Sequence, residues 1–280
     1  MTLRVLVTGG TGFVGKHLIR SLAAHDVEVH LVVKKNHTNY DVSFPSVVRV
    51  IPTLDLFSES PSWWEDVCRG IDVVVHLAWY VEPGKYLESP LNLDCLIGSL
   101  NLAKGAVLAG VRRIVGIGTC FEYDLSSGFV SVATPLKPET PYAASKAALY
   151  LALSQWLPSE SVSFAWCRLF YLYGEGEDQR RLVPYIRSQL EAGRVAELSS
   201  GNQIRDFMNV VEAASAIANI AMGHENGPLD ICTGIPTTIR ELATVIGEDY
   251  GRTDLLKFGS RPDDPFNPKC VVGIRPDCNS

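Results

Sequence analysis

Short apolar runs alternate with helix-compatible stretches along the first 170 residues. Continuous apolar runs of this length are typical of strands buried on both faces of a parallel sheet. The alternation predicts an α/β fold in which helices cover both faces of a doubly wound parallel sheet. The apolar runs are Leu3–Val7, Val27–Val33, Val47–Ile51, Val73–Leu77, Ile114–Ile117 and Val162–Leu169, and the clearest helical patterns are Gly15–Ala24 and Leu91–Ala109.

A glycine-rich turn follows the first apolar run. Gly9, Gly12 and Gly15 have the spacing Gly-x-x-Gly-x-x-Gly. Glycines there let the backbone turn sharply, approach a pyrophosphate and pack the next helix on the strand. The free N–H groups at the start of that helix attract phosphate. Because the spacing departs from the Gly-Lys-[Ser/Thr] of a P-loop, it favours a dinucleotide over ATP.

The rhythm of the pattern changes near residue 170. Glycine and proline then separate shorter elements, as is typical of a smaller domain built onto a sheet. We therefore predict a dinucleotide-binding domain over 1–168, rejoined by part of 207–234. The segments 169–206 and 235–280 are predicted to form a smaller substrate-binding region.

The end of the second predicted strand bears on the choice of cofactor. An NAD site usually places an acid there to bind the ribose 2′-hydroxyl, whereas a 2′-phosphate needs a cation instead. Val33 stands in the place of the acid, and Lys34 and Lys35 follow it. This pattern favours NADP, with NAD still possible; a solvated pair of surface lysines is the alternative interpretation.

Residues after the third and fourth strands are further candidates, because ligands bind at the carboxyl ends of parallel strands. Asp55 can accept a hydrogen bond from an adenine amino group, or it can cap the next helix. Small Ala78 lets the chain pass close to a cofactor. His76 is interpreted as a packed core histidine, because no partner ligands at a workable spacing indicate a metal site.

The candidate chemistry lies in Thr119 and in the segment Tyr142-Ala-Ala-Ser-Lys146. Thr140 and Pro141 form a good helix start, so Tyr142 and Lys146, four residues apart, share a helix face. A lysine ammonium near a phenol is expected to lower the pKa of the phenol, which would make Tyr142 a usable acid or base. Thr119 follows the fifth strand and is expected to hold the reacting oxygen.

Composition narrows the classes of partner. The 280 residues carry a formal net charge of −6 with no basic block, which argues against nucleic acid. No apolar run in the sequence approaches the length of a membrane span, so no membrane partner is expected. The seven cysteines are scattered and form no Cys-x-x-Cys pair, which favours reduced thiols over disulfides or zinc ligands. Reduced thiols in turn favour a cytoplasmic location.

The combination of these motifs resembles the extended short-chain dehydrogenase/reductase family, in particular its branch of nucleotide-sugar epimerases, dehydratases and reductases. That family has a Rossmann domain and a smaller C-terminal substrate-binding domain. The resemblance covers nearly the whole chain: Thr8–Gly15, His76–Ala78, Gly110–Val115 before Gly118-Thr119, Tyr142 with Lys146, Arg168–Gly174, Arg205–Phe207 and Arg261–Asp264.

The resemblance implies a role for each matching residue. Thr119, Tyr142 and Lys146 would form a catalytic triad, and Arg205 and Arg261 would bind the diphosphate of the substrate. The expected cofactor contacts are Gly9, Gly12, Phe13, Val14, Gly15, Lys34, Lys35, Asp55, Leu56, Leu77, Ala78, Trp79, Tyr142 and Lys146. The expected substrate contacts are Tyr80, Thr119, Cys120, Phe121, Tyr142, Tyr171, Val183, Arg205 and Arg261.

Departures from the family pattern refine the expected activity. Dehydratases of this branch follow the threonine with an Asp-Glu pair, whereas this chain has Cys120-Phe121, which argues against 4,6-dehydration. Cys95 and Tyr171 stand where asparagine is frequent. The chain also ends near the point where the family adds a terminal helix, so either a short or a truncated member is expected.

The sequence therefore predicts an NADPH-dependent reductase acting on a keto group, with C4 preferred, of a nucleotide-linked deoxysugar. One alternative is an NAD-dependent nucleotide-sugar 4-epimerase, which uses the same triad and regenerates its cofactor. Another is a non-catalytic NADP-sensing module, against which the intact triad argues. The family also implies a homodimer.

Overall fold

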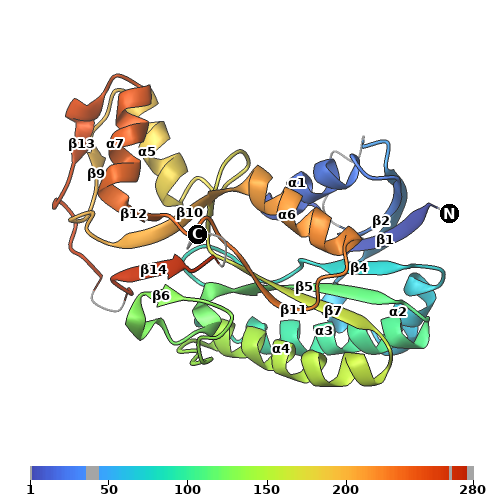
Figure 1. Cartoon of the computed structure of the whole chain (residues 1–280). Helices are drawn as coiled ribbons and strands as arrows, with labels where there is room; N and C mark the ends of the chain where they lie inside the picture. Colours follow the sequence, from blue (N-terminus) through green and yellow to red (C-terminus); the bar gives the residue numbers. More distant parts are fainter. Residues whose placement is uncertain (1, 36–43, 265–266, 276–280) are drawn as a thin grey trace. The chain divides into compact units, whose positions relative to one another are not determined.

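The computed structural model describes residues 2–35, 44–264 and 267–275, and it divides into two compact units (Figure 1). The first unit comprises Met1–Glu122, Pro138–Leu169 and Val210–Ile231. The second comprises Tyr123–Lys137, Phe170–Asn209 and Cys232–Ser280. Each unit is described in turn.

The first unit is built on a seven-stranded sheet in which every pair of neighbouring strands is parallel. The strand order is β11-β7-β5-β4-β1-β2-β3, so the sheet is doubly wound around β1 and β4. This arrangement confirms the predicted fold class. The strands are β1 (Leu3–Thr8), β2 (Val27–Lys34), β3 (Val47–Thr53), β4 (Val73–His76), β5 (Arg113–Thr119), β7 (Ser163–Leu169) and β11 (Gly227–Ile231).

Helices cover both faces of this sheet. One face carries α1 and α6, which contact each other, and the other carries α2, α3 and α4 (Figure 1). Two of these helices begin at capping signals: Ser60 and Thr140 each accept a backbone N–H bond, and each is followed by proline. The helices are α1 (Phe13–Leu22), α2 (Pro61–Cys68), α3 (Leu91–Leu108), α4 (Pro141–Ser159) and α6 (Val210–Met222).

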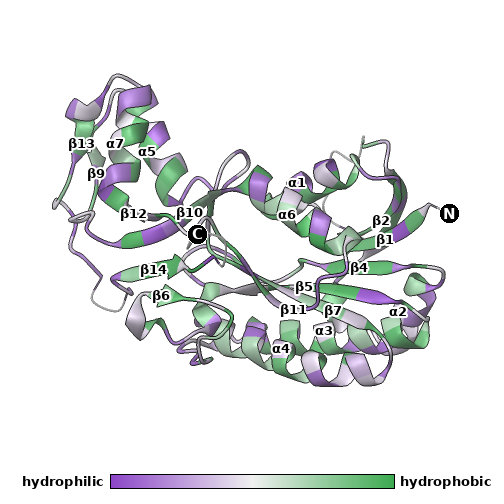
Figure 2. Cartoon of the chain, viewed as in Figure 1, coloured by the Kyte–Doolittle hydropathy of each residue, from purple (hydrophilic) through white to green (hydrophobic). Residues whose placement is uncertain are grey.

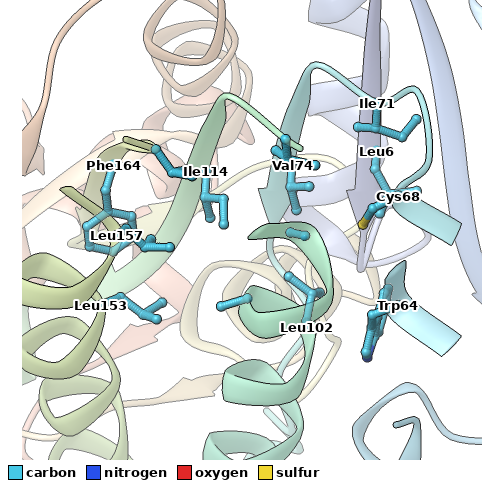
Figure 3. Close-up of a cluster of buried hydrophobic side chains, with 14 of the residues drawn as sticks. Leu6, Trp64, Cys68, Ile71, Val74, Leu102, Ile114, Leu153, Leu157 and Phe164 are labelled. Atoms are coloured by element: carbon cyan, nitrogen blue, oxygen red, sulfur yellow. The ribbon is translucent and has the colours of Figure 1, made fainter. Parts of the chain in front are cut away.

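The main core of the first unit lies between the sheet and the α2–α3–α4 layer. Figure 3 shows Leu6, Val74 and Ile114 projecting from neighbouring strands toward Leu102 of α3. Trp64 of α2 and Leu153 of α4 close the two sides of this cluster. The sheet strands are coloured mainly as hydrophobic in Figure 2, as expected for strands covered on both faces.

Helix α3 differs from the sequence expectation in one respect. Its 18 residues are long and apolar enough to cross a membrane by length and composition, whereas no run of that length was expected. However, 44% of the helix is buried in the fold, and it packs against α2 and α4. Its apolar character is therefore accounted for in part by its contacts within the first unit.

The second unit contains two small sheets and two helices in the part of the chain that the structure describes. One sheet has the order β12-β10-β14-β6, with β8 also paired to β10, and the other pairs β9 with β13. Helices α5 and α7 pack on a core that includes Val183, Ile186, Leu190 and Ile246. The elements are β6 (Phe129–Val130), β8 (Tyr171–Tyr173), α5 (Leu182–Glu191), β9 (Ala196–Glu197), β10 (Ile204–Asn209), β12 (Pro236–Thr238), α7 (Ile239–Asp249), β13 (Leu256–Lys257) and β14 (Cys270–Gly273).

The observed units differ from the sequence-based division in one place. Residues 123–137 were assigned to the first domain, but in the structure they belong to the second unit. The reason is pairing: β6 in this segment forms a parallel bridge with β14 near the end of the chain. A contact between segments so distant in the sequence leaves no local signal.

Candidate active site

The glycine turn forms a close-packed loop between β1 and α1. Gly9 has a φ of +73°, and a Cβ there would lie 2.6 Å from the backbone nitrogen of Ala78. A Cβ on Gly15 would lie 2.2 Å from the carbonyl oxygen of Gly9. Gly12 is the N-cap of α1 and brings no side chain to cap the first N–H groups of that helix. The loop therefore fits a pyrophosphate, which would meet N–H donors and no Cβ.

The remaining residues of the expected cofactor site lie around this loop and at the ends of β2, β3 and β4. Phe13 and Val14 form the first turn of α1, and both are half-buried. Leu56 begins the 3₁₀ turn Leu56–Ser58, and Leu77 directly follows β4. The backbone N–H of Leu77 donates to the carbonyl of Thr8 at 3.2 Å, which ties the end of β4 to the start of the glycine turn.

The end of β2 lacks the acid that is usual in an NAD site. Val33 is buried, whereas Lys34 and Lys35 are exposed. An acid in place of Val33 would lie in the core, so Lys34 is the first position from which a side chain can meet a ribose or its phosphate. The lysine pair therefore remains the feature of β2 that bears on the cofactor.

Asp55 adopts the second of the two roles considered for it. Its carboxylate accepts from the backbone N–H of Phe57 at 3.1 Å and from the hydroxyl of Ser58 at 3.0 Å. Asp55 is thus the N-cap of a short 3₁₀ turn. Its side chain is exposed, so an adenine contact stays a prediction.

His76 is a packed core histidine, as predicted. Its Nδ1 lies 2.7 Å from the Thr8 hydroxyl, and its Nε2 lies 2.7 Å from the Ser99 hydroxyl. Burial, with a further contribution from the charge of Lys146, lowers the pKa of His76 to about 3. The imidazole is therefore neutral and bridges β1, β4 and α3 beneath the glycine turn.

Thr119, Tyr142 and Lys146 are all buried side chains of the first unit. Thr119 is the last residue of β5, while Tyr142 and Lys146 lie in the first turns of α4. The hydroxyl of Thr119 lies close enough to Tyr142 to lower the pKa of its phenol. The ammonium of Lys146 donates to the carbonyl oxygen of Ile117 at 2.6 Å. The structure thus brings the three expected catalytic residues to one end of β5.

The Lys146 ammonium also contacts the ring of Trp79. The Nζ atom lies 3.8 Å from the centroid of the Trp79 ring, within the range of a cation–π contact. The indole is itself fixed, because its Nε1 donates to Asn92 at 2.8 Å. Burial lowers the pKa of Lys146 to about 7, against the opposing effects of Glu122 and Cys95.

The expected lowering of the Tyr142 pKa is wrong for this structure. Burial is the largest cause, and it raises the pKa of Tyr142 well above its usual range; Tyr86, Glu122 and Cys120 raise it further. The Lys146 ammonium bonds to Ile117 and lies on Trp79, so it does not offset this burial. Tyr142 is therefore a protonated phenol, able to donate a proton but not to accept one.

Three expected substrate contacts lie within two residues of Thr119 or Trp79 in the sequence. Cys120 is buried directly after Thr119, and the backbone N–H of Phe121 donates to the Thr119 hydroxyl at 3.3 Å. Tyr80 is half-buried after β4, and its hydroxyl donates to Glu82 at 3.0 Å. The interpretation of Cys120 as a small wall residue fits its burial.

The remaining expected substrate residues lie in the second unit. Arg205 is 2% exposed; its guanidinium donates to Asn267 at 2.9 Å and stacks on Tyr171. Arg261 is exposed and donates to the hydroxyl of Tyr185 at 2.9 Å. Val183 is 3% exposed and packs in the core of this unit. Within the described residues the two arginines bind different partners, so their convergence on one diphosphate stays a prediction.

Sequence reasoning missed one buried polar group behind Thr119. Glu122 is fully buried and forms an ion pair with Arg168. Arg168 was noted as part of a family motif but was given no role. The available signal was an acid three residues after a strand end, within a stretch of otherwise apolar and aromatic residues.

A doubly wound sheet, a glycine turn at its first strand and a Thr/Tyr/Lys group at its fifth define a Rossmann-type, nicotinamide-dependent enzyme of the extended short-chain kind. The chain belongs to the NAD dependent epimerase/dehydratase family, whose model matches residues 5–231.

Characterised relatives act on nucleotide-linked sugars. The chain is 22% identical over 275 residues to dTDP-6-deoxy-L-talose 4-dehydrogenase (NAD(+)) from Aggregatibacter actinomycetemcomitans, covering 98% of this chain and 100% of that one. It is 29% identical over 270 residues to GDP-6-deoxy-D-mannose reductase from Pseudomonas aeruginosa, covering 89% and 80%. The structure of UDP-glucose 4-epimerase from Thermus thermophilus with NAD matches with a TM-score of 0.81 at 26% identity, covering 97% and 90%.

Proposed function

We propose that the protein is an NADPH-dependent reductase that converts a keto group, at C4 in the preferred case, of a nucleotide-linked deoxysugar to an alcohol. The observation that carries the proposal is the burial of a protonated Tyr142 close to Thr119, the last residue of β5. A protonated phenol suits the reductive direction, because the oxygen of a carbonyl that accepts hydride must also gain a proton.

Each residue of the group has a role that follows from its place. The bound nicotinamide would supply the hydride. Thr119 hydrogen-bonds the keto oxygen and holds it beside Tyr142, which donates its proton to that oxygen. Lys146, held by Ile117 and Trp79, keeps a buried cationic group at the same end of the sheet.

Two relatives support the class of substrate. One is named as a 4-dehydrogenase of a dTDP-linked 6-deoxyhexose, and the other as a reductase of a GDP-linked 6-deoxyhexose. Dehydrogenation at C4 of a sugar is the reverse of ketone reduction there. The absence of an Asp-Glu pair after Thr119 separates this chain from the dehydratase pattern.

The NAD-dependent 4-epimerase remains the second candidate, and the match to the Thermus thermophilus epimerase favours it. The two functions differ in cofactor turnover, because a reductase consumes one reduced cofactor for each product. With a nucleotide-linked 4-keto-6-deoxyhexose, we expect the absorbance of NADPH to fall in step with alcohol formation. Interconversion of two 4-hydroxy sugars without added cofactor would establish the epimerase instead.

The preference for NADPH rests on the exposed Lys34 and Lys35 at the end of β2. We expect Lys34→Asp to raise the KM for NADPH by about tenfold or more, because a hydrogen-bonded cation is replaced by a charge that repels the 2′-phosphate. The KM for NADH should fall. Lys257→Asp, at a lysine of the second unit, is the matched charge control. A wild-type enzyme that prefers NADH would contradict the assignment.

The proposed binding of the substrate diphosphate by Arg205 and Arg261 is best tested at Arg261. Arg261 is exposed, whereas Arg205 is buried and already bonded to Asn267, so its loss would also affect folding. We expect Arg261→Ala to raise the KM for the nucleotide sugar roughly tenfold with little change in kcat, the effect of removing a charge-assisted hydrogen bond. Arg252→Ala removes another arginine of this unit and should leave the KM unchanged. An unaltered KM in Arg261→Ala would remove this residue from the site.

Homodimerisation stays a prediction of the family resemblance. Helices α3 and α4 contact each other and both expose apolar side chains, including Leu93, Ile97 and Leu151. Such side chains on neighbouring helices are compatible with the expected contact between two copies of the chain.

A further inference from the structure

Glu122 lies directly behind the proposed catalytic group and is fully buried. It ends the 3₁₀ turn Cys120–Glu122, which follows β5 without a break. Its Oε1 accepts from the backbone N–H of Thr119 at 2.8 Å, and its Oε2 accepts from the Nε of Arg168 at 2.8 Å. Both oxygens also lie 3.1 Å from the indole Nε1 of Trp166. The carboxyl group is therefore enclosed by donors.

The fold makes room for this carboxylate at a specific position. A Cβ on Gly118 would lie 2.4 Å from Oε1 of Glu122 and 2.3 Å from Nε1 of Trp166. Arg168 is only 1% exposed, and its guanidinium stacks on the ring of Tyr150 at 4.6 Å. Burying two charges is costly unless hydrogen bonds satisfy them, so an isolated ion pair here is a poor source of stability.

The charge state of Glu122 follows from its partners. Burial raises the pKa of Glu122 above its usual value, although Arg168 and the hydrogen bonds to Thr119 and Trp166 oppose this rise. Because every one of these contacts is a donor, a proton on the carboxyl group would have no acceptor among them. The ionised form is the one that fits.

Glu122 affects the proposed catalytic residues in two ways. The carboxylate fixes the backbone of Thr119, whose side chain lies close to Tyr142. Its negative charge also raises the pKa of Tyr142 and of Lys146. Among the described residues, the other charged or titratable groups facing these two are Tyr86 and Cys120 at Tyr142, and Cys95 and His76 at Lys146. Of these groups, Glu122 acts on both Tyr142 and Lys146.

The geometry points to Glu122 as a positioning residue, which holds Thr119 in place and supplies a fixed negative charge behind Tyr142 and Lys146. This inference rests on the proposed function of the Thr119–Tyr142–Lys146 group. Glu122 does not touch the reacting atoms in this assignment, and Arg168 serves to keep it ionised and oriented.

The first test measures steady-state kinetics of Glu122→Gln, which keeps the size and the acceptor oxygen but removes the charge. We expect kcat to fall by about 10- to 100-fold, the usual cost of a misplaced catalytic group, while the KM for NADPH changes by less than about twofold. Glu160→Gln is the matched control, because Glu160 also accepts from a tryptophan indole but is exposed. A kcat close to that of wild type would overturn the proposal.

The second test needs no substrate, so it separates this proposal from the proposed function. The titration of Lys146 is followed by NMR of protein labelled with ¹³Cε-lysine, with Lys146→Arg used to assign the signal. Wild type is expected to titrate at a pH of about 7. Glu122→Gln should move the midpoint to lower pH, because the charge that favours the ammonium is gone. An unchanged midpoint overturns the electrostatic role even if wild type reduces no sugar.

A third variant covers the case in which Glu122→Gln does not fold, since it leaves Arg168 as an unpaired buried charge. The double variant Glu122→Gln/Arg168→Met removes both charges and keeps comparable volume. We expect it to recover the thermal stability of wild type but not its kcat or its Lys146 midpoint. If stability and kcat return together, the pair is merely structural and the proposal fails.

Discussion

Replacing Tyr142 with Phe is expected to lower the rate of ketone reduction by a factor of about 10² to 10⁴, the usual contribution of a positioned general acid. The change removes only the hydroxyl close to Thr119 and leaves the buried ring in its place. The dissociation constant for NADPH, measured by fluorescence titration, should stay nearly unchanged. The loss should therefore appear in kcat and not in cofactor affinity.

Tyr150→Phe is the matched control for this prediction. Tyr150 lies on the same helix, α4, and its ring stacks under Arg168, a contact that Phe preserves. Near-normal turnover in Tyr142→Phe, or an equal loss in Tyr150→Phe, would show that Tyr142 is not the proton donor.

The second large effect concerns acid stability and arises at His76. The folded protein holds this imidazole neutral down to a pH of about 3, whereas the unfolded chain takes up a proton near pH 6.5. Between these values the unfolded state binds more protons, so the free energy of unfolding falls as the pH falls. The contribution of His76 is fully present above a pH of about 6.5, and its loss by a pH of about 3 is on the order of 5 kcal/mol.

The effect is isolated by comparing variants. His76→Gln keeps a polar side chain that cannot be protonated in this range, so its unfolding free energy should depend less steeply on pH than that of wild type. Urea denaturation at several pH values between about 7.5 and about 4 measures the two slopes. His224→Gln, at an exposed histidine, is the control. Parallel slopes for wild type and His76→Gln would contradict the buried neutral imidazole.

The parts of the fold that could be predicted are those that depend on patterns of neighbouring residues in the sequence. The six apolar runs are strands of the sheet, with ends that differ by a few residues, and Thr140-Pro141 begins α4 as expected. Helix α1 begins at Phe13 instead of Gly15, because Gly12 is its N-cap and the carbonyl of Gly12 already accepts from the N–H of Lys16 at 3.1 Å. Buried strands and capped helices carry their signal within a few neighbouring residues.

What escaped prediction depends on contacts between distant residues. The burial of Arg205 follows from Asn267 and from the ring of Tyr171, neither of which is near it in the sequence. The rise in the Tyr142 pKa follows from burial, whereas the pattern of a lysine four residues away suggested the opposite. A spacing shows which residues share a helix face, but not where a long side chain directs its charge.

The division of the chain between its two units has a consequence for biosynthesis. The chain passes from one unit to the other five times, and β11, an edge strand of the seven-stranded sheet, ends only at Ile231. The first unit therefore cannot be completed on the ribosome until more than four-fifths of the 280 residues have been made. Strand β6 must likewise wait for β14. Until then, unpaired strand edges are exposed in the nascent chain, which makes this interval the one in which chaperones have most to protect.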